Sequence, residues 1–347
     1  MNYSNFIGWD IGGAHLKVAS VSNVGEINFV EQYATPLWQG LDKLSNIFPV
    51  AINKIPRGPV AHAVTMTAEL VDIFENRQAG IDTLTALCKE YLGEQINLYA
   101  ATGNFLKANE FNEQTTSIAS ANWHASALVT ASLVDTGVFV DIGSTTTDII
   151  PFQDKKLLNI GFDDQTRLRS DELLYTGIIR TPLMALAQKV PFAGYWQSIA
   201  AEHFATTADV YRVLGLLNEE DDLMESADGA IKDSEHSLKR LARMVGADAA
   251  RYNYNNWYKL AEYFADVQKR LISDSILRVT SKQPDKEIRI IGAGTGRFLI
   301  KEIAERLNYP YIEFSELFSC ATQLQHQCNV CAPAVAVAQL SRLNILQ

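Results

Sequence analysis

The sequence predicts an α/β protein whose two domains face a shared cleft. Two stretches repeat one pattern, in which an apolar strand ends in Asp-Ile-Gly and a short turn leads into a second apolar strand. One copy is centred on Asp10 and the other on Asp141. Segments with the periodicity of strands and of helices alternate along the chain, which is typical of α/β architecture. At 347 residues the chain also exceeds one ordinary hydrophobic core, so two domains are expected.

The order of the expected elements supports this fold class. In the first part of the chain we expect strands at 6–11, 16–20, 25–31, 60–66 and 96–100, and helices at 37–50, 80–92 and 120–133. After a hairpin at 138–151 we expect a strand at 156–160, mostly helix at 199–280, a strand before Gly292, a helix at 298–307, a strand at 309–312 and a helix at 333–346. We therefore place one domain at 1–135 plus 319–347, and the second, with a helical insertion, at 136–318.

The two hairpin turns have the composition of phosphate-binding loops. Glycine lets the backbone approach a ligand closely, and neighbouring amides and hydroxyls offer donors to anionic oxygens. The carboxylates of Asp10, Asp141 and Asp148 would repel a bare phosphate, so they suit a bound metal or an attacking group. A tight hairpin without a ligand can also use Gly-Ser-Thr, but two copies favour a shared phosphate site. Its candidate ligands are Gly12, Gly13, Gly143, Ser144, Thr145 and Thr146.

Two further groups of charged residues have open interpretations. Glu69 and Asp72 follow a predicted strand, where they either line the edge of the cleft or form a solvated helix N-terminus. Arg167, Arg169 and Arg180 either bind a polyanionic substrate or form surface ion pairs with the acidic residues around them. We expect at least one of these arginines to have a functional role.

A third glycine turn, at Gly292, Gly294 and Gly296, follows a short apolar strand and precedes a helix. Its spacing differs from the Gly-x-Gly-x-x-Gly of dinucleotide-binding folds, and it comes late in the chain. A glycine turn at a helix N-terminus can pack flat against a nucleobase or receive phosphate oxygens.

Composition excludes several classes of protein. Hydrophobic content of 47% and charged content of 20% are typical of a globular protein. The net charge of -10 argues against nucleic acid or an anionic membrane as the main partner. The sequence has neither an 18-residue apolar run nor the basic and apolar start of a signal peptide, so we expect a cytoplasmic protein.

The C-terminal region contains four potential zinc ligands, Cys320, His326, Cys328 and Cys331. Because only one Cys-x-x-Cys is present, free thiols are the favoured interpretation. Two other histidines are ambiguous. His15, in the first hairpin turn, either touches a phosphate or lies on the surface, whereas His124 has the setting of a hydrogen-bonded core residue.

The three glycine turns, in this order, resemble the actin-like ATPase superfamily, which includes sugar kinases, acetate kinase and heat-shock chaperone ATPases. Residues 6–17 and 138–151 resemble its two phosphate motifs, and residues 290–297 its adenosine motif. More narrowly, the chain resembles the hydantoinase/oxoprolinase-related group and, within it, proteins of tetrahydromethanopterin-linked C1 transfer. That likeness runs over nearly the whole chain, and the stretches that carry it are 66–70, 121–124, 141–148, 171–177, 180–182, 207–212 and 332–336.

The resemblance implies a two-domain actin-like fold, related to ribonuclease H, and a transferase of cofactor biosynthesis. An archaeal branch of the group joins an aminomethylfuran-methyl diphosphate to the phenol of a tyramine derivative and expels diphosphate. For this chain the resemblance implies a furan diphosphate and a phenolic glutamyl compound as substrates. Mg²⁺ near Asp10 and Asp141 would neutralise the diphosphate, and Asp148 or Glu69 would take the phenol proton. Arg167, Arg169 or Arg180 would hold the polyglutamyl or diphosphate end.

Two alternatives use the same residues. One is ATP-dependent chemistry, either a small-molecule kinase or an oxoprolinase-type amidohydrolase, with Gly292, Gly294 and Gly296 at the nucleotide. The other is a non-catalytic ATP-binding switch, for which the chain has little length to spare. The sequence does not fix the oligomeric state, and a homodimer is one of the states left open.

Overall fold

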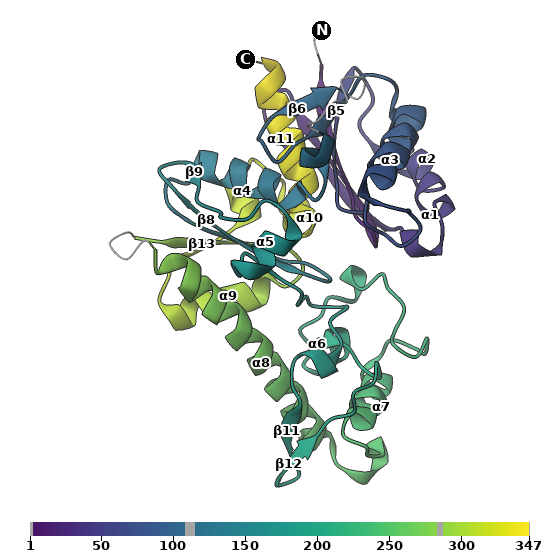
Figure 1. The fold of residues 1–347 in the computed structure, drawn as a ribbon, viewed down its shortest axis with the longest axis vertical. Coiled ribbons are helices and arrows are strands. Elements are labelled where there is room, and N and C mark those ends of the chain that lie inside the picture. The colour runs from purple at the N-terminus through teal and green to yellow at the C-terminus, as the bar shows by residue number, and fades with distance from the viewer. Residues whose placement is uncertain (1–2, 108–114, 283–286, 347) are drawn as a thin grey trace.

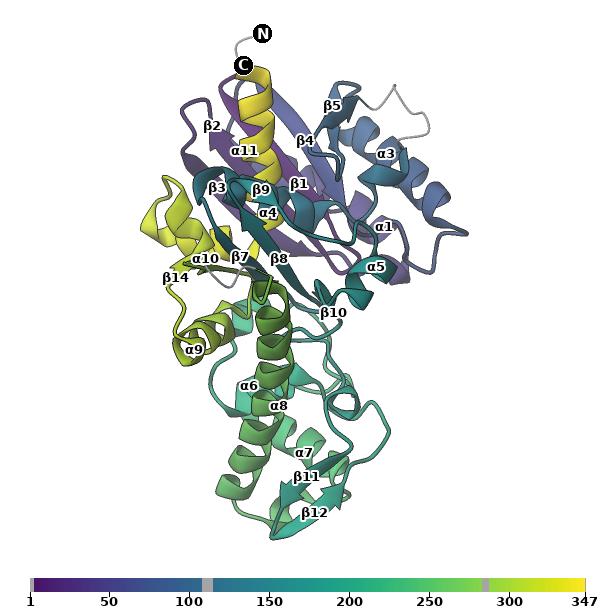
Figure 2. The same cartoon turned by 60° about the vertical axis from the view of Figure 1, so that its left-hand side comes forward.

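A computed structural model describes residues 3–107, 115–282 and 287–346, and it contains two six-stranded sheets (Figures 1 and 2). The first sheet has the order β3-β2-β1-β4-β5-β6, in which β1 pairs antiparallel with β2 and parallel with β4. Its strands are β1 (Asn5–Ile11), β2 (His15–Ser22), β3 (Ile27–Ala34), β4 (Val60–Met66), β5 (Ile96–Tyr99) and β6 (Phe105–Lys107). Helices α1 (Asp42–Ser45), α2 (Phe48–Lys54) and α3 (Arg77–Leu92) belong to this part of the chain.

The second sheet repeats the arrangement of the first at its centre. Its order is β10-β8-β7-β13-β14, with β9 paired to β8, and β7 pairs antiparallel with β8 and parallel with β13. The strands are β7 (Gly137–Ile142), β8 (Thr147–Gln153), β9 (Lys156–Leu157), β10 (Leu173–Leu174), β13 (Arg289–Ala293) and β14 (Tyr311–Glu313). The helices beside it are α5 (Asp164–Arg169), α9 (Arg297–Leu307) and α10 (Thr322–Val330). Both predicted hairpins, and the predicted α/β fold class, are confirmed.

Two helices rich in small residues lie between the sheets. α11 (Ala332–Leu346) packs on β1, β2 and β4, whereas α4 (Asn122–Leu133) packs on β7, β8 and β9. The two helices also pack on each other, and their buried alanines and valines share one apolar cluster with both sheets. Small side chains let the helices and the strands approach closely, so this layer sets how the two sheets face each other.

A mostly helical lobe extends from the second sheet (Figure 1). It contains a two-stranded hairpin, β11 (Lys189–Phe192) and β12 (Tyr195–Ser198), and the helices α6 (Thr207–Val213), α7 (Ser234–Met244) and α8 (Tyr254–Thr280). α8 is long enough to run from the sheet into the lobe, where Trp257 stacks on Phe192 with ring centroids 4.9 Å apart. The mostly helical character expected for 199–280 is confirmed.

Two expected elements differ in the structure, and one hairpin was not expected. The single helix expected at 37–50 is broken into a short 3-10 turn at Leu37–Gln39 followed by α1 and α2, because Gly40 has φ +134. The strand expected at 156–160 contains only Lys156–Leu157. The hairpin at 189–198 was missed, although Ala193 and Gly194 both have positive φ, as tight hairpin turns require. The division into 1–135 plus 319–347 and 136–318 stays a prediction.

No helix among residues 3–107, 115–282 and 287–346 combines the length and the apolar character that a membrane span needs.

Replacing Gly8 by Ala tests the packing between β1 and α11. A Cβ atom at Gly8 would overlap the carbonyl oxygen of Ala334, which is backbone and cannot rotate away. We expect G8A to lower the free energy of unfolding by about 2 kcal/mol or more, measured by urea denaturation. V24A, at a side chain that is 80% exposed, is the control. Equal stability of G8A and wild type would contradict this packing.

Candidate active site

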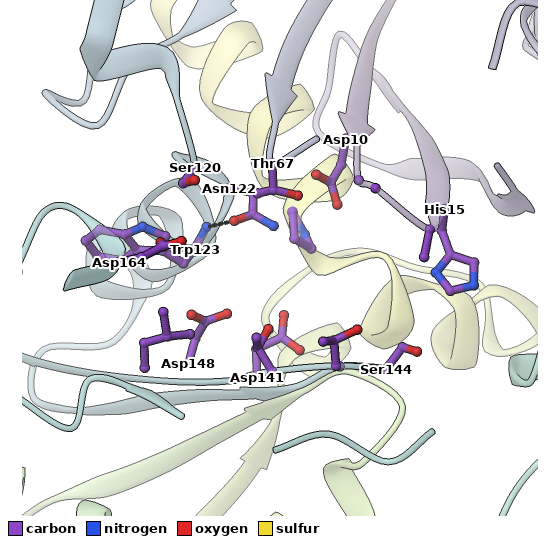
Figure 3. A pocket seen from close by; sticks show the side chains of 18 of the residues that line it. Asp10, His15, Thr67, Ser120, Asn122, Trp123, Asp141, Ser144, Asp148 and Asp164 are labelled. Carbon is purple, nitrogen blue, oxygen red and sulfur yellow. Dashed lines mark hydrogen bonds between the residues drawn. The ribbon is translucent and has the colours of Figure 1, made fainter. Parts of the chain in front are cut away.

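The two predicted phosphate turns face each other across one cavity of about 370 Å³. Asp10 and Thr67 approach it from the first sheet, and Asp141, Asp148 and Ser144 approach it from the second (Figure 3). All six candidate phosphate ligands line it, namely Gly12, Gly13, Gly143, Ser144, Thr145 and Thr146. Whether they bind phosphate stays a prediction.

Both turns are closed by the same backbone hydrogen bond. Gly12 N–H donates to the carbonyl oxygen of His15 at 2.9 Å, and Gly143 N–H donates to that of Thr146, also at 2.9 Å. Each turn follows a strand whose last two residues are Asp-Ile, and each leads into an antiparallel partner strand. The repeated sequence pattern thus produces a repeated geometry on the two sides of the cavity.

The register of the hairpins reveals a residue that sequence analysis missed. Asp10 lies directly opposite Lys17, and Asp141 lies directly opposite Asp148. Directly opposed residues of an antiparallel pair project to the same face of the sheet, so all four side chains line the cavity. The repeated sequence pattern could have predicted the position of Lys17. Lys17 comes seven positions after Asp10, and Asp148 comes seven positions after Asp141.

Burial perturbs the ionisation of the two central carboxyl groups. Burial raises the pKa of Asp10 to about 6 and that of Asp141 to about 7, although Lys17 lowers both. Burial alone would lower the pKa of Lys17, but Asp10, Asp141 and Asp221 together raise it. The cavity therefore contains an ammonium group together with carboxyl groups that are partly protonated near neutral pH.

Asp148 is held by a buried arginine. Arg167 Nη2 donates to Asp148 Oδ1 at 2.6 Å and to the carbonyl oxygen of Glu172 at 3.0 Å, while its guanidinium lies 4.0 Å from the Trp123 ring centroid. Burial raises the pKa of Asp148, and Arg167 opposes this rise. α5 carries Arg167 into place because Asp163 caps its start, accepting a hydrogen bond from Thr166 N–H at 2.7 Å.

Arg180 is fixed to the second turn. Its backbone N–H donates to the carbonyl oxygen of Ser144 at 2.9 Å, and its Nη1 donates to Thr145 Oγ1 at 3.4 Å. Gly177 permits this approach, because a Cβ there would lie 2.5 Å from backbone atoms of Ser144 and Thr145. Among the three arginines, Arg167 and Arg180 line the cavity, whereas Arg169 is exposed outside it.

Several polar atoms of the residues that line the cavity are buried and, within the described part of the chain, have no hydrogen-bond partner. Among them are Asp10 Oδ1, His15 Nε2 and Ser144 Oγ, and the nitrogens Trp123 Nε1 and Arg167 Nε belong to the same group. Burial lowers the pKa of His15 to about 3, with Lys17 and Arg180 acting in the same direction, so the ring is neutral and can donate or accept. Unpaired buried polar groups cost free energy, which a polar ligand would recover.

Glu69 lies behind the cavity rather than in it. Its carboxylate is fully buried and accepts a hydrogen bond from Ser120 Oγ at 2.8 Å, with Arg77 Nε 4.0 Å away. Ser120, which has a positive φ of 48, lines the cavity in its place. Asp72, the other acid at this position of the sequence, is exposed.

The third glycine turn packs against the second hairpin. A Cβ at Gly292 would lie 2.6 Å from the Tyr311 ring, and one at Gly296 would lie 2.5 Å from Ile142 and Ile178. A Cβ at Gly294 would overlap Asp141 Oδ1. These contacts within the chain account for the three glycines. A separate cavity of about 400 Å³, lined by Thr295, Arg297, Phe298 and Lys301 among others, lies beside this turn.

The residues suit a divalent cation only if a bound ligand or water supplies part of its coordination. Among the described residues, no group of three or more His, Cys, Asp or Glu side chains is arranged to hold a metal. Asp10 and Asp141 offer carboxylate oxygens from opposite sides of the cavity, which suits Mg²⁺ that shares its coordination with phosphate oxygens and water. Lys17 already supplies one positive charge that interacts with both carboxylates.

The four residues considered for zinc do not converge. Arg297 Nη2 donates to His326 Nδ1 at 2.9 Å, so the proton of the neutral ring lies on Nε2, which is 3.0 Å from Asp221 Oδ1. Cys328 and Cys331 are buried and Cys320 is half-buried, and all three are free thiols. His124 is held in the core by Tyr99, whose hydroxyl lies 2.8 Å from His124 Nδ1.

The chain is similar in sequence to known proteins over nearly its whole length. The chain is 29% identical, over 335 residues and 96% of each chain, to the (4-{4-[2-(gamma-L-glutamylamino)ethyl]phenoxymethyl}furan-2-yl)methanamine synthase of Methanocaldococcus jannaschii. It is 34% identical over 157 residues to the synthase of the same name from Methanococcus vannielii, matching 45% of this chain and 70% of that one.

One solved structure, the nucleotide-free acetone carboxylase, matches 89% of this chain and 68% of its own with a TM-score of 0.50 and 10% identity, which shows the fold alone. The predicted α/β fold class is confirmed, and its arrangement matches that of this solved structure. The hydantoinase/oxoprolinase family matches residues 61–341, which include the second hairpin, the third glycine turn and most of α11. The chain belongs to the hydantoinase/oxoprolinase family.

Proposed function

We propose that this protein is a transferase that forms an aryl ether in the biosynthesis of a methanofuran-type C1 carrier. It joins an aminomethylfuran-methyl diphosphate to the phenol of a tyramine or tyrosine derivative and releases diphosphate. The observation that carries the proposal is the likeness to the Methanocaldococcus jannaschii synthase over 96% of both chains, whose name describes a phenoxymethyl-furan product. The cavity supports it, since its two facing turns offer donors for a diphosphate, and its carboxylates can hold a cation or accept a proton.

The chemistry of the step follows from the groups in the cavity. The phenol loses its proton, its oxygen forms a bond to the furan-bound CH₂, and the bond between that carbon and the diphosphate oxygen breaks. The electron pair of the broken bond leaves with the diphosphate, so neither ATP nor a redox partner is consumed. Lys17 and Arg180 stabilise the leaving charge, together with the amides and hydroxyls of both turns.

The carboxyl groups have separate roles in this proposal. Asp148 accepts the phenol proton, and Arg167 holds it in position at 2.6 Å. Asp164, which lines the same cavity, offers a carboxylate to the ammonium of the aminomethyl group. Mg²⁺ held by Asp10 and Asp141 would neutralise further charge on the diphosphate.

The alternative is an ATP-dependent kinase or amidohydrolase, with a nucleotide at the cavity beside Gly294. A single assay separates the two hypotheses. Purified protein is mixed with the furan diphosphate and γ-glutamyltyramine without ATP, and ether and diphosphate are quantified by mass spectrometry and a coupled phosphate assay. We expect equal amounts of ether and diphosphate. Turnover that requires ATP and releases ADP would instead support the alternative.

We expect D141N to lower turnover by about 100-fold or more, because the amide removes the charge that a cation and Lys17 require. D82N, an exposed carboxylate on α3, is the matched control and should retain full activity. Full turnover of D141N would remove Asp141 from the mechanism. Near-UV circular dichroism of both variants checks that the folds are equal.

The pH dependence of kcat/KM tests the ionisation of the cavity. Since Asp10 and Asp141 must be charged to act, and their pKa values are about 6 and about 7, activity should rise with pH through the window from 6 to 7. Lys17 lowers both pKa values, so in K17M the rise should move to higher pH. A rise centred near pH 4 in wild type, or no movement in K17M, would contradict these assignments.

A further inference from the structure

A second cavity, of about 500 Å³, adjoins the first at Arg180, which lines both. We call it the Trp38 cavity, and it lies between two parts of the chain that are far apart in sequence. One wall comes from the end of β3 and the turn at Leu37–Gln39, and the other comes from α6 and the loop at 222–227. The Trp38 cavity therefore opens between the first sheet and the helical lobe, next to the proposed diphosphate site.

The walls of the Trp38 cavity suit an aromatic ring. Trp38, which is 38% exposed, presents its indole beside apolar side chains from the opposite wall, and these are Ile179, Pro182, Ala208, Leu223 and Met224. Aromatic ligands gain both buried apolar area and ring contacts in such a setting.

Asp209, Arg212 and Asp222, which line the Trp38 cavity on and after α6, are each paired with an oppositely charged side chain. Asp209 Oδ1 is 2.7 Å from Arg240 Nε, Arg212 Nε is 2.9 Å from Glu219 Oε1, and Arg212 Nη2 is 2.5 Å from Asp222 Oδ2. With their charges already paired, Asp209, Arg212 and Asp222 offer little to a phosphate. The cavity is thus chemically different from the first one, which is rich in turn amides and hydroxyls.

Arg180 connects the two cavities. Its guanidinium carbon lies 4.9 Å from the centre of the Trp38 ring, while its Nη1 donates to Thr145 Oγ1 in the phosphate turn. A group that lies against Trp38 and reaches past Arg180 arrives at the hydroxyl turn of the first cavity. The positive charge of Arg180 favours an oxygen that loses its proton there.

We propose that the Trp38 cavity is the acceptor site, which binds a para-substituted phenol with its ring on Trp38 and its hydroxyl toward Arg180. The proposal rests on the proposed function, to which it adds the place and the recognition of the second substrate. In the transfer step, the phenol oxygen gives its proton to Asp148 and forms the bond to the CH₂ carbon. The bond from that carbon to the diphosphate oxygen breaks, and the diphosphate leaves with its electron pair. The tail of the phenol extends toward the loop at 222–227 and its polar residues Glu225 and Ser226.

The first test measures binding without turnover, with tyramine as the probe and isothermal titration calorimetry as the readout. We expect W38A to weaken tyramine binding at least tenfold and W38F to stay within about threefold of wild type. W196A removes a tryptophan that is 67% exposed on β12, and this matched control should bind as wild type does. Equal binding by W38A and wild type, or no binding by wild type, would overturn the proposal.

The second test uses the ether-forming assay and separates the two substrates. In W38A, KM for γ-glutamyltyramine should rise at least tenfold while KM for the furan diphosphate stays within twofold. A rise in both constants would assign Trp38 a general structural role and overturn the proposal. If wild type forms no ether yet binds tyramine through Trp38, the proposed function fails and the phenol site stands.

Discussion

Two carboxyl groups and one ammonium group share one cavity, and much of the structure serves to keep them there. Asp10 and Lys17 come from one sheet and Asp141 from the other, so the cavity exists only when the sheets face each other. The charges are costly without a ligand, as the raised pKa values of both aspartates indicate. The fold tolerates the free-energy cost of burying these three charged groups because the hydrophobic cores on either side of the cavity are large.

A shell of residues around the cavity holds its side chains without entering it. Glu69 accepts from Ser120, and Gly177 lets the chain before Arg180 lie against the second turn. Gln268 Nε2, on α8, donates to the carbonyl oxygen of Gly177 at 2.9 Å, which links the helical lobe to this turn. The carboxylate of Glu172 accepts from the backbone N–H groups of Ile160 and Gly161, which fixes the segment before α5. These contacts fix the directions in which the reactive side chains point, and catalysis depends on that orientation.

Sequence patterns were informative where structure is local and less so where it depends on distant contacts. Both hairpins could be predicted, because an apolar run, a carboxylate and a glycine turn are adjacent in sequence. Lys17 was missed because its role arises from strand register, which pairs it with Asp10 across the hairpin. The positions of Glu69 and Arg169 outside the cavity could not be predicted either. They follow from how the chain packs around Ser120 and α5, and no short motif encodes that packing.

The position of α11 also has a consequence for how the chain folds. Gln339 Nε2 donates to the carbonyl oxygen of Gly25 at 3.0 Å, across 314 positions of sequence, and the same helix covers Gly8 on β1. The first sheet therefore completes its core only after residues 332–346 have been synthesised, by which time the second sheet and the helical lobe have emerged. Contacts this distant slow folding, since a long loop must close before they form. Until residues 332–346 have been synthesised, α11 cannot cover the face of β1 that contains Gly8, and an apolar strand face without its cover favours aggregation.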